Sequence, residues 1–364
     1  MGTERNGGRA VTLRQVAERA GVSKSTAAIV LSGRAVACRI SAPCAERVRA
    51  AAQLLGYQGN YHARTLSTGR AATLGLTVGE GGHRGVASSF WGAIADGVAA
   101  AARGRGYDLL LLGGSGGDAA IAHAASRLET RRVDALIVLR QLFYRLPDEL
   151  LNTRRPVVTI GGQQGEGFPD VRLDAAPGIA AAVSHLAGLG HRVALWLAHE
   201  RDGEVVLPER RAAFLAAARR HRMAVRETAI PAFDSQGMSL EQVVARYQVQ
   251  LRALALPKGV TAVFCYNDLM ALAAQGVLRE RGLGLPDALA LIGFDDLHAE
   301  LAAPPLSTIS HGLHELGAAA VALAVDLAEG GRPPPLTLVP ARFVARASTV
   351  TPPGGQRVPV VSGG

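Results

Sequence analysis

The chain has 364 residues, of which 48% are hydrophobic and 19% charged, and a formal net charge of +9. These values exclude a disordered chain and leave room for more than one domain. No apolar run is long enough to span a membrane, and the first ten residues carry no apolar stretch typical of a signal peptide. The three cysteines are odd in number and lack metal-ligand spacing, so we expect reduced thiols, no metal site and a cytoplasmic location.

The positive charge is concentrated at the N-terminal end of the chain. Residues 1–70 contain eleven Lys or Arg and three acidic residues, a net charge of +8, and the remaining 294 residues carry a net charge of only +1. Such a concentration on one small segment is typical of a protein that contacts phosphates. We therefore expect nucleic acid as a partner and association with the nucleoid.

The segment Val11 to Gly33 has the pattern of two short helices. Thr12 and Gln15 fit a capping box at the start of the first helix. Gly21 interrupts this helix, and Ser23 is placed to cap the second. Inward-facing apolar positions recur at helical spacing at Leu13, Val16, Ala17, Ala20, Ala27, Val30 and Leu31. The opposite face of the second helix carries Lys24, Ser25, Ala28, Ile29 and Ser32. This pattern predicts a helix-turn-helix whose second helix enters the DNA major groove; an ordinary helical hairpin is the alternative.

A third helix follows the two helices of the helix-turn-helix. Ser41 can cap this helix, which Gly56 and Gly59 end. Residues 60–69 follow and could form two helical turns. A helix this short and polar is not stable alone, so we interpret the segment as a linker that becomes helical only under some conditions. The polar residues 1–10 and the segment from Pro352 are expected to be flexible tails.

From Thr73 onward, apolar runs alternate with amphipathic segments. The expected strands are Thr73–Val78, Asp108–Leu112, Ala135–Leu139, Val157–Ile160, Val193–Leu197, Ala262–Cys265 and Leu289–Phe294. The expected helices are Trp91–Arg105, Ala119–Glu129, Ala176–Leu189, Glu209–His221, Leu240–Ala253, Asp268–Arg281 and Leu313–Glu329. This alternation predicts parallel sheets covered by helices on both faces. The segment is longer than one such sheet needs, so we expect two similar lobes.

Several segments together resemble the LacI/GalR family of bacterial transcription regulators. They are VTLRQVAERAGVSKST, LLGYQGN, ARTLSTGR, AAVSHLAGLGHR, TAVFCYNDLMALAAQGVLRERGL, LIGFDD and PPLSTI, and they follow the family's order and spacing from Val11 to Pro352. The resemblance implies a helix-turn-helix headpiece at 11–59, a hinge helix at 60–70 and a core at 71–351. That core resembles a periplasmic binding protein, with two doubly wound parallel-sheet lobes and a ligand cleft between them.

The resemblance also implies which residues contact DNA. Lys24, Ser25 and Ile29, with Ala28 beside them, match positions of the recognition helix that reach base edges. Thr12, Ser23, Thr26 and Ser32 match phosphate contacts. Leu66 matches an apolar wedge in the minor groove, and its hinge neighbours are Asn60, His62, Ala63 and Arg64. The family usually has Arg at 29 and Ser or Thr at 28, so this helix presents an apolar face that suits thymine methyl groups.

For the core, the resemblance implies an effector site between the lobes. Arg210, Asn267 and Asp295 match ligand-contacting positions of one lobe, with Phe90, Trp91 and Arg140 facing them from the other. A guanidinium, a carboxylate, an amide and an aromatic ring suit a polyol. We therefore expect a small carbohydrate that acts as an inducer of a repressor; a non-sugar corepressor such as a purine is the alternative. Each of these side chains could instead have a structural or surface role.

Other classes of protein are less consistent with the sequence. Gly113–Gly117 lacks the spacing of a dinucleotide-binding loop, and the adjacent Asp295 and Asp296 diverge too far for an acid–base pair. His311 and His314 lack a third metal ligand, so we interpret them as surface histidines. A periplasmic sugar-binding protein would need a signal peptide and no headpiece. We therefore expect neither an enzyme, a cofactor nor a membrane partner.

The expected assembly is a homodimer. Two headpieces are needed to read a near-palindromic operator, as the resemblance implies. The C-terminal tail is rich in Pro and Gly and has no heptad leucines, which argues against a tetramer.

Overall fold

The computed structural model describes residues 11–33, 35–57, 69–78, 89–113, 117–140, 145–161, 167–201, 204–205, 207–233, 235 and 238–349. The chain divides into two compact units, Met1–Ala72 and Thr73–Gly364. The expected tails and residues 58–68, which include nearly all of the predicted hinge, lie outside the described residues. Among the described helices, none is both long and apolar enough to cross a membrane.

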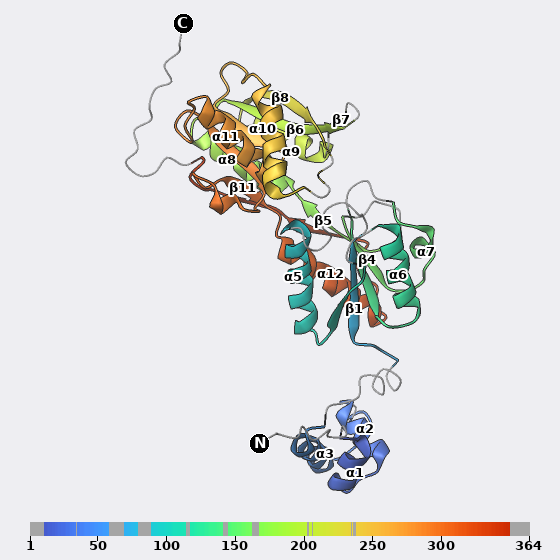
Figure 1. Cartoon of the computed structure of the whole chain (residues 1–364). Helices are drawn as coiled ribbons and strands as arrows, with labels where there is room; N and C mark the ends of the chain where they lie inside the picture. Colours follow the sequence, from blue (N-terminus) through green and yellow to red (C-terminus); the bar gives the residue numbers. More distant parts are fainter. Residues whose placement is uncertain are drawn as a thin grey trace, which may run out of the picture. The chain divides into compact units, whose positions relative to one another are not determined.

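The first unit contains the predicted helix-turn-helix followed by a third helix (Figure 1). Its helices are α1 (Leu13–Ala20), α2 (Lys24–Leu31) and α3 (Ala42–Leu55). The capping box between Thr12 and Gln15 is present, and Gly21 ends α1 in the left-handed conformation, with φ 66°, which a residue without Cβ adopts readily. Ser23 caps α2, whereas the Ser41 side chain makes no capping hydrogen bond to α3. The small core consists of Val16, Ala17, Ala20, Ala27, Val30, Ala35, Ala45, Val48, Ala51 and Ala52.

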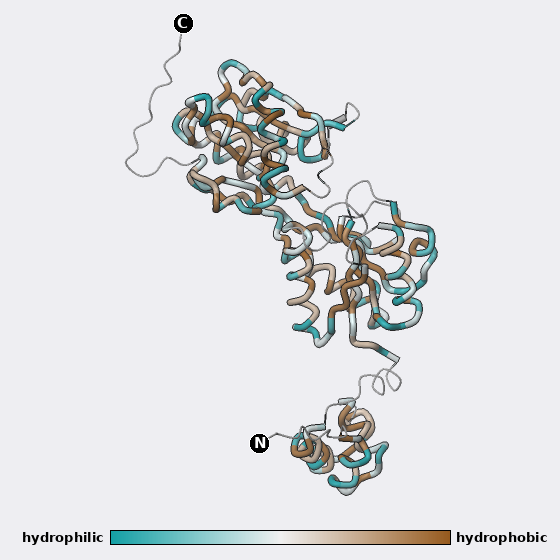
Figure 2. Tube along the Cα trace, in the orientation of Figure 1, coloured by the Kyte–Doolittle hydropathy of each residue, from teal (hydrophilic) through white to brown (hydrophobic). Residues whose placement is uncertain are grey.

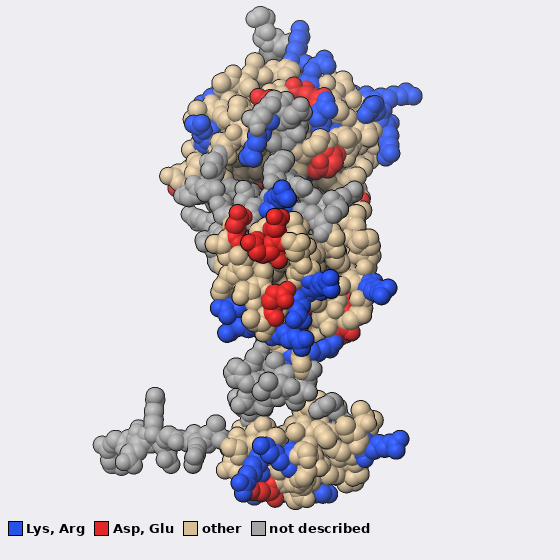
Figure 3. Space-filling model, turned by 90° about the vertical axis from the view of Figure 1, so that its right-hand side faces the viewer, with Lys and Arg blue, Asp and Glu red and all other residues tan. Residues whose placement is uncertain are grey.

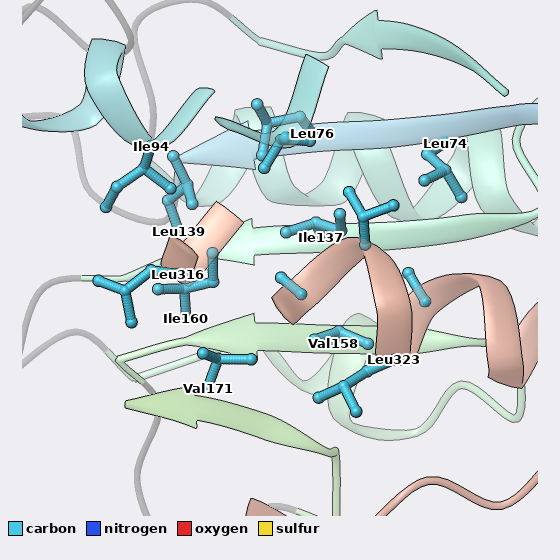
Figure 4. Close-up of a cluster of buried hydrophobic side chains, with 14 of the residues drawn as sticks. Leu74, Leu76, Ile94, Ile137, Leu139, Val158, Ile160, Val171, Leu316 and Leu323 are labelled. Atoms are coloured by element: carbon cyan, nitrogen blue, oxygen red, sulfur yellow. The ribbon is translucent and has the colours of Figure 1, made fainter. Parts of the chain in front are cut away.

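The second unit begins with a parallel sheet, whose strand order is β12-β5-β4-β3-β1-β2. Its strands are β1 (Thr73–Val78), β2 (Asp108–Leu111), β3 (Ala135–Leu139), β4 (Val157–Ile160), β5 (Asp170–Asp174) and β12 (Leu336–Pro340). Helices α5 (Ser89–Gly104) and α12 (Leu313–Ala328) cover one face, and α6 (Asp118–Glu129) and α7 (Asp148–Leu151) cover the other. Side chains such as Leu76, Ile137, Ile160 and Leu316 interlock on the α5 and α12 face (Figure 4). We call this sheet and its helices lobe 1.

A second, mostly parallel sheet follows, which we call lobe 2 together with its helices. Its strands are β6 (Val193–Arg201), β7 (Glu204–Val205), β8 (Ala224–Pro231), β9 (Ala262–Cys265), β10 (Ala290–Asp295), β11 (Ser307–Ser310) and β13 (Arg342–Val344). They lie in the order β13-β11-β10-β9-β6-β7, with β8 also paired to β6. Helices α8 (Ala176–Gly188) and α9 (Pro208–Arg220) cover one face, and α10 (Leu240–Arg252) and α11 (Asp268–Glu280) cover the other. Apolar residues concentrate in the strands of both sheets, while polar residues follow the loops (Figure 2).

The chain passes between the lobes after β5, after β11 and after β12, so each lobe is built from separated parts of the sequence. Helix α12 follows a strand of lobe 2 but packs on lobe 1 against α5. The predicted two-lobed α/β core is therefore confirmed. The sequence did not predict strands β5, β7, β8, β11, β12 and β13, and it ended β6 four residues early.

Candidate functional site

Helix α2 presents a small cluster of hydroxyl groups at its N-terminus. Ser23 Oγ accepts a hydrogen bond from Thr26 N at 3.0 Å and lies 2.9 Å from Ser25 Oγ and 2.8 Å from Thr26 Oγ1. The free backbone N–H groups and the positive end of the helix dipole favour a phosphate at such a site. Lys24 and Ser25 are exposed beside it. This end of α2 has the chemistry of a DNA-backbone contact.

The rest of the predicted DNA face has mixed exposure. Ala28 and Ile29 are half-buried, so each exposes only part of its side chain at the surface. Thr12 is exposed while capping α1. Ser32 is half-buried, and its hydroxyl donates to Ile29 O at 3.0 Å. Several Lys and Arg side chains stand out on the face of the headpiece seen in Figure 3, in keeping with the charge of +8 in residues 1–70.

In lobe 2, polar and aromatic side chains gather where the parallel strands end. Arg210 lies in the first turn of α9, and its guanidinium carbon is 3.8 Å from the centre of the Phe294 ring and 5.9 Å from that of Tyr266. Its Nη2 lies 3.4 Å from Nε2 of His311, which directly follows β11. Burial lowers the pKa of Arg210, and the Asp295 carboxylate opposes this shift. The aromatic rings thus hold a half-buried cation at the edge of the sheet.

His311 joins Arg210 to the predicted carboxylate. Its Nε2 lies 3.1 Å from Oδ1 of Asp295, the last residue of β10. The interpretation of His311 as a surface histidine is wrong, because only 3% of the residue is exposed. Residue 311 directly follows the buried strand β11 and precedes α12, and its side chain lies in the interior. Burial lowers the pKa of His311, and Asp295 opposes the shift.

The backbone that carries Asp295 has unusual dihedral angles. Asp295 has φ 113° and Asp296 has φ 61°, both in a region that L-residues rarely adopt. Leu297 N donates to Asp268 Oδ2 at 2.7 Å, and Arg346 Nη2 lies 2.7 Å from Asp296 Oδ1. These two contacts hold the loop directly after Asp295.

Asp268 is itself buried at the start of α11. Its Oδ1 accepts a hydrogen bond from Thr308 Oγ1 at 2.6 Å, across Gly293 of β10. A Cβ at Gly293 would lie 2.1 Å from this oxygen, so only glycine leaves room for the contact. Burial, together with the charge of Asp295, raises the pKa of Asp268 to about 8. Asp268 and Asp296 were not among the predicted site residues.

The side-chain amide of Asn267 makes hydrogen bonds within lobe 2. Its Oδ1 accepts from Met270 N at 2.8 Å and so caps α11, and the side chain is also hydrogen-bonded to Tyr247 of α10. Tyr247 and Tyr266 belong to an aromatic cluster around His199, whose ring centroid lies 5.3 Å from that of Tyr247 and 4.5 Å from that of Tyr266. Phe233 packs against both His199 and Tyr247. Burial lowers the pKa of His199 to about 4.

Lobe 1 contributes mainly Phe90 to this region. Its ring meets that of His311 edge-on, with centroids 5.4 Å apart, and Ser89 Oγ lies 3.0 Å from His298 Nε2 of lobe 2. Trp91, by contrast, is 7% exposed and packs in the lobe 1 core, where its indole is too enclosed to cover a ligand. Arg140 is buried directly after β3. Of the predicted residues, the structure therefore brings Arg210, Asp295 and Phe90 together around His311.

Two cavities lie elsewhere in the described part of the core. One of about 50 Å³ is lined mainly by apolar residues of β6, β9, α10 and α11. The other, of about 180 Å³, lies at the start of α12 beside β12. Within the described ranges, no group of three or more His, Cys, Asp or Glu could hold a metal ion. The polar cluster around His311 is therefore the strongest candidate for a ligand site.

A basic helix-turn-helix unit and a two-lobed α/β core with polar groups at its strand ends define a class, that of DNA-binding transcription regulators with a periplasmic-binding-protein-like core. Residues 12–60 match the family described as "Bacterial regulatory proteins, lacI family", and residues 183–349 match "Periplasmic binding protein-like domain". The chain is 31% identical to the HTH-type transcriptional regulator CelR of Thermobifida fusca over 340 residues, 90% of this chain and 95% of CelR. The chain therefore belongs to the lacI family of bacterial regulatory proteins.

Solved structures show the same architecture. The Lac repressor dimer bound to operator and the anti-inducer ONPF is 25% identical, with a TM-score of 0.71 covering 94% of this chain and 100% of that chain. A complex of the transcriptional regulator CelR with cellobiose is 26% identical, with a TM-score of 0.59 covering 93% of this chain and 99% of that chain.

Besides Asp268 and Asp296, sequence reasoning missed five side chains of this region: His199, Phe233, Tyr247, Tyr266 and His311. One available signal was their place in the chain, because ligands of open α/β sheets bind beyond the carboxyl ends of the strands. His199 lies near the end of β6, and Tyr266 and His311 directly follow β9 and β11. Phe233 and Tyr247 are placed by the packing of α10, for which the sequence has no comparable signal.

Proposed function

We propose that this protein is a dimeric repressor that binds a near-palindromic operator and releases it when a small carbohydrate binds between the lobes. The observation that carries the effector part is the convergence of Arg210, Asp295 and Phe90 on His311. The guanidinium is a hydrogen-bond donor, the carboxylate is an acceptor, and aromatic rings lie beside both. Sugars present vicinal hydroxyl groups and apolar ring faces, which match these partners.

Two known proteins support this ligand class. CelR has been solved with cellobiose, and the Lac repressor with an anti-inducer and operator, and both align over most of this chain. A ligand changes operator affinity only if it binds one arrangement of the lobes better than another. Arg210 and Asp295 of lobe 2 and Phe90 of lobe 1 lie where such a ligand would contact both lobes.

The DNA part of the proposal assigns base contacts to Lys24, Ser25 and Ile29, with Ala28 beside them, and phosphate contacts to Thr12, Ser23, Thr26 and Ser32. The exposed hydroxyl cluster and the local positive charge favour this role. Hinge contacts by Asn60, His62, Ala63, Arg64 and Leu66 stay a prediction outside the described residues. Leu66→Ala should weaken operator binding without affecting effector binding, because it removes the apolar wedge.

The operator-binding test begins with selection of DNA sequences by the full-length protein, followed by affinity measurements on the selected site. Lys24→Ala should weaken binding to the selected site, by about 1–3 kcal/mol if the side chain reads a guanine. Lys258→Ala is a matched control, because Lys258 is the only other lysine and lies in the core. Equal affinity of the Lys24 variant and the parent would contradict the assigned recognition face.

The effector test is a thermal-shift screen of sugars and purines, followed by calorimetry with each hit. Arg210→Ala should remove a charge-assisted contact of about 1.5–3 kcal/mol while leaving operator affinity of the ligand-free protein unchanged. The neighbouring Arg211 is a matched control, because it pairs with Glu227 at the surface. Unchanged ligand affinity in both Arg210→Ala and Asp295→Ala would place the effector site elsewhere. A screen in which only purines bind would exclude a carbohydrate effector.

A further inference from the structure

His311 is a buried titratable group that joins the two lobes. Its ring lies edge-on to Phe90 of lobe 1 and to Phe294 of lobe 2, with centroid distances of 5.4 and 5.0 Å. Its Nε2 faces Asp295 at 3.1 Å and Arg210 at 3.4 Å. The side chain therefore lies between the two groups that are proposed to bind the effector.

The hydrogen-bonding capacities of these groups determine where the His311 proton lies. A guanidinium is only a donor and a carboxylate is only an acceptor, so Nε2 can serve one of them but not both. The Asp295 oxygen is the nearer and carries a full negative charge, which strengthens a hydrogen bond donated to it. Arg210 is held instead by the face of the Phe294 ring at 3.8 Å. The geometry favours a neutral imidazole whose Nε2–H donates to Asp295.

The electrostatic balance around the ring supports the same state. Among the described residues, the charged groups that face it are Arg210 from α9 and Asp295 from β10, and the rings of Phe90 and Phe294 are uncharged. One cation and one anion cancel, whereas an imidazolium would add an uncompensated positive charge in a buried site. Burial indeed lowers the pKa of His311, despite the opposing effect of Asp295.

We propose that His311 is a specificity-determining residue of the effector site, which, as a neutral Nε2–H imidazole, keeps the site electrically balanced and selects uncharged over anionic ligands. This inference rests on the proposed carbohydrate effector and adds the charge class of that ligand. An anionic sugar would enter a site without a compensating positive charge, unless His311 took up a proton at the same time. Discrimination between uncharged and anionic sugars should therefore weaken as the pH falls.

The charge state can be tested without any ligand. Long-range ¹H–¹⁵N spectra of the ¹⁵N-histidine-labelled protein, with the His311 signals assigned from their loss in His311→Gln, report the protonation of both ring nitrogens. We expect the neutral Nε2–H form at about pH 7, the usual range in which an exposed histidine begins to titrate. An imidazolium, or a proton on Nδ1 alone, would overturn the proposal. His314, which is exposed three residues further along the chain, provides the comparison signal of a solvent-accessible histidine.

The selectivity test uses cellobiose, its uncharged open-chain derivative cellobiitol and the anionic cellobionate, with affinities measured by calorimetry. The last two share an open chain and differ mainly in the carboxylate. We expect cellobiitol to bind at least about tenfold tighter than cellobionate at about pH 7.5, because the anion's charge would be buried without a partner. The ratio should narrow as the pH is lowered, in the parent and in His314→Gln alike, because His311 takes up a proton together with the anion.

The variant His311→Gln separates the role of the proton from that of packing. The Gln amide can still donate to Asp295 but cannot become charged, so the preference for cellobiitol should persist and lose its pH dependence. Equal affinity for the two compounds in the parent, or the same pH dependence in His311→Gln as in the parent, would refute the proposed role. If the parent binds none of the three sugars, a cellobiose-like effector is excluded, and the spectra alone decide the charge state of His311.

Discussion

The contact between α5 and α12 leads to a sharp prediction about stability. A Cβ built on Gly97 of α5 would lie 2.5 Å from the carbonyl oxygen of His314 and 2.6 Å from its Cα, and one on Gly317 of α12 would lie 2.5 Å from Ile94 O. The two helices thus touch through their backbones. Gly97→Ala would force them apart, because backbone atoms cannot rotate out of the way as a side chain can.

The magnitude follows from two opposing effects. Alanine favours a helix over glycine by about 0.8–1.0 kcal/mol. Overpacking a rigid contact costs about 1–3 kcal/mol, and here all three of the nearest atoms are backbone. A contact made entirely with backbone belongs in the upper part of that range, about 2–3 kcal/mol, so we expect a net loss of about 1–2 kcal/mol in the free energy of unfolding of the core.

Urea unfolding followed by tryptophan fluorescence would measure this loss, with the buried Trp91 of the same helix as a reporter. Gly104→Ala is the matched control, because it lies at the end of α5 and its Cβ would meet nothing within 4 Å. The control should change stability by less than about 0.5 kcal/mol. If Gly97→Ala proved as stable as Gly104→Ala, the close backbone contact would be refuted.

Three further predictions concern the headpiece and the aromatic cluster. Ser23→Ala should destabilise the headpiece by about 1 kcal/mol in thermal unfolding, because it removes a capping acceptor, whereas Ser41→Ala should have little effect, since Ser41 makes no capping bond. His199 has a pKa of about 4 in the native protein against 6.5 in its unperturbed state, so between these values the unfolded chain binds a proton that the native protein excludes. The free energy of unfolding should therefore fall by up to about 3 kcal/mol as the pH drops through this interval. Urea unfolding at several pH values should show that His199→Phe abolishes this loss. The exposed Arg47 should contribute to DNA affinity through a phosphate contact, which does not depend on the base sequence. Arg47→Ala should therefore weaken binding to specific and random DNA alike and reduce the slope of log affinity against log salt by about 0.9, measured by fluorescence anisotropy. An unchanged slope would exclude a phosphate contact.

The sequence by itself determined the elements whose signals are local. The capping residues Thr12 and Ser23 and the turn at Gly21 act within a few positions along the chain, so the helix-turn-helix could be predicted from them. The central strands β1, β3, β4 and β9 also matched their predicted bounds, because strands buried on both faces are continuous apolar runs. The difference in net charge between the headpiece and the core can be counted from the sequence alone.

Edge strands were decided by tertiary structure. Strand β8 has the largely exposed sequence AVRETAIP, and β12 is exposed at alternate residues, so neither contains an apolar run. Strand β13 has only three residues and is defined by its antiparallel pairing with β11. Their strand conformation depends on partners that are distant in the sequence, and single-sequence patterns do not record such pairing.

The composition of the candidate site also depended on the tertiary structure. Arg210, Asp295 and Phe90 could be predicted through a family resemblance, but the residue on which they converge was assigned to the surface. His311 is buried because β11 lies inside the second sheet and α12 then crosses to the first, and no local pattern around position 311 records that path. The same crossing brings Gly317 against α5. Local capping, charge and apolar runs thus determined which elements form, whereas long-range packing decided which side chains meet.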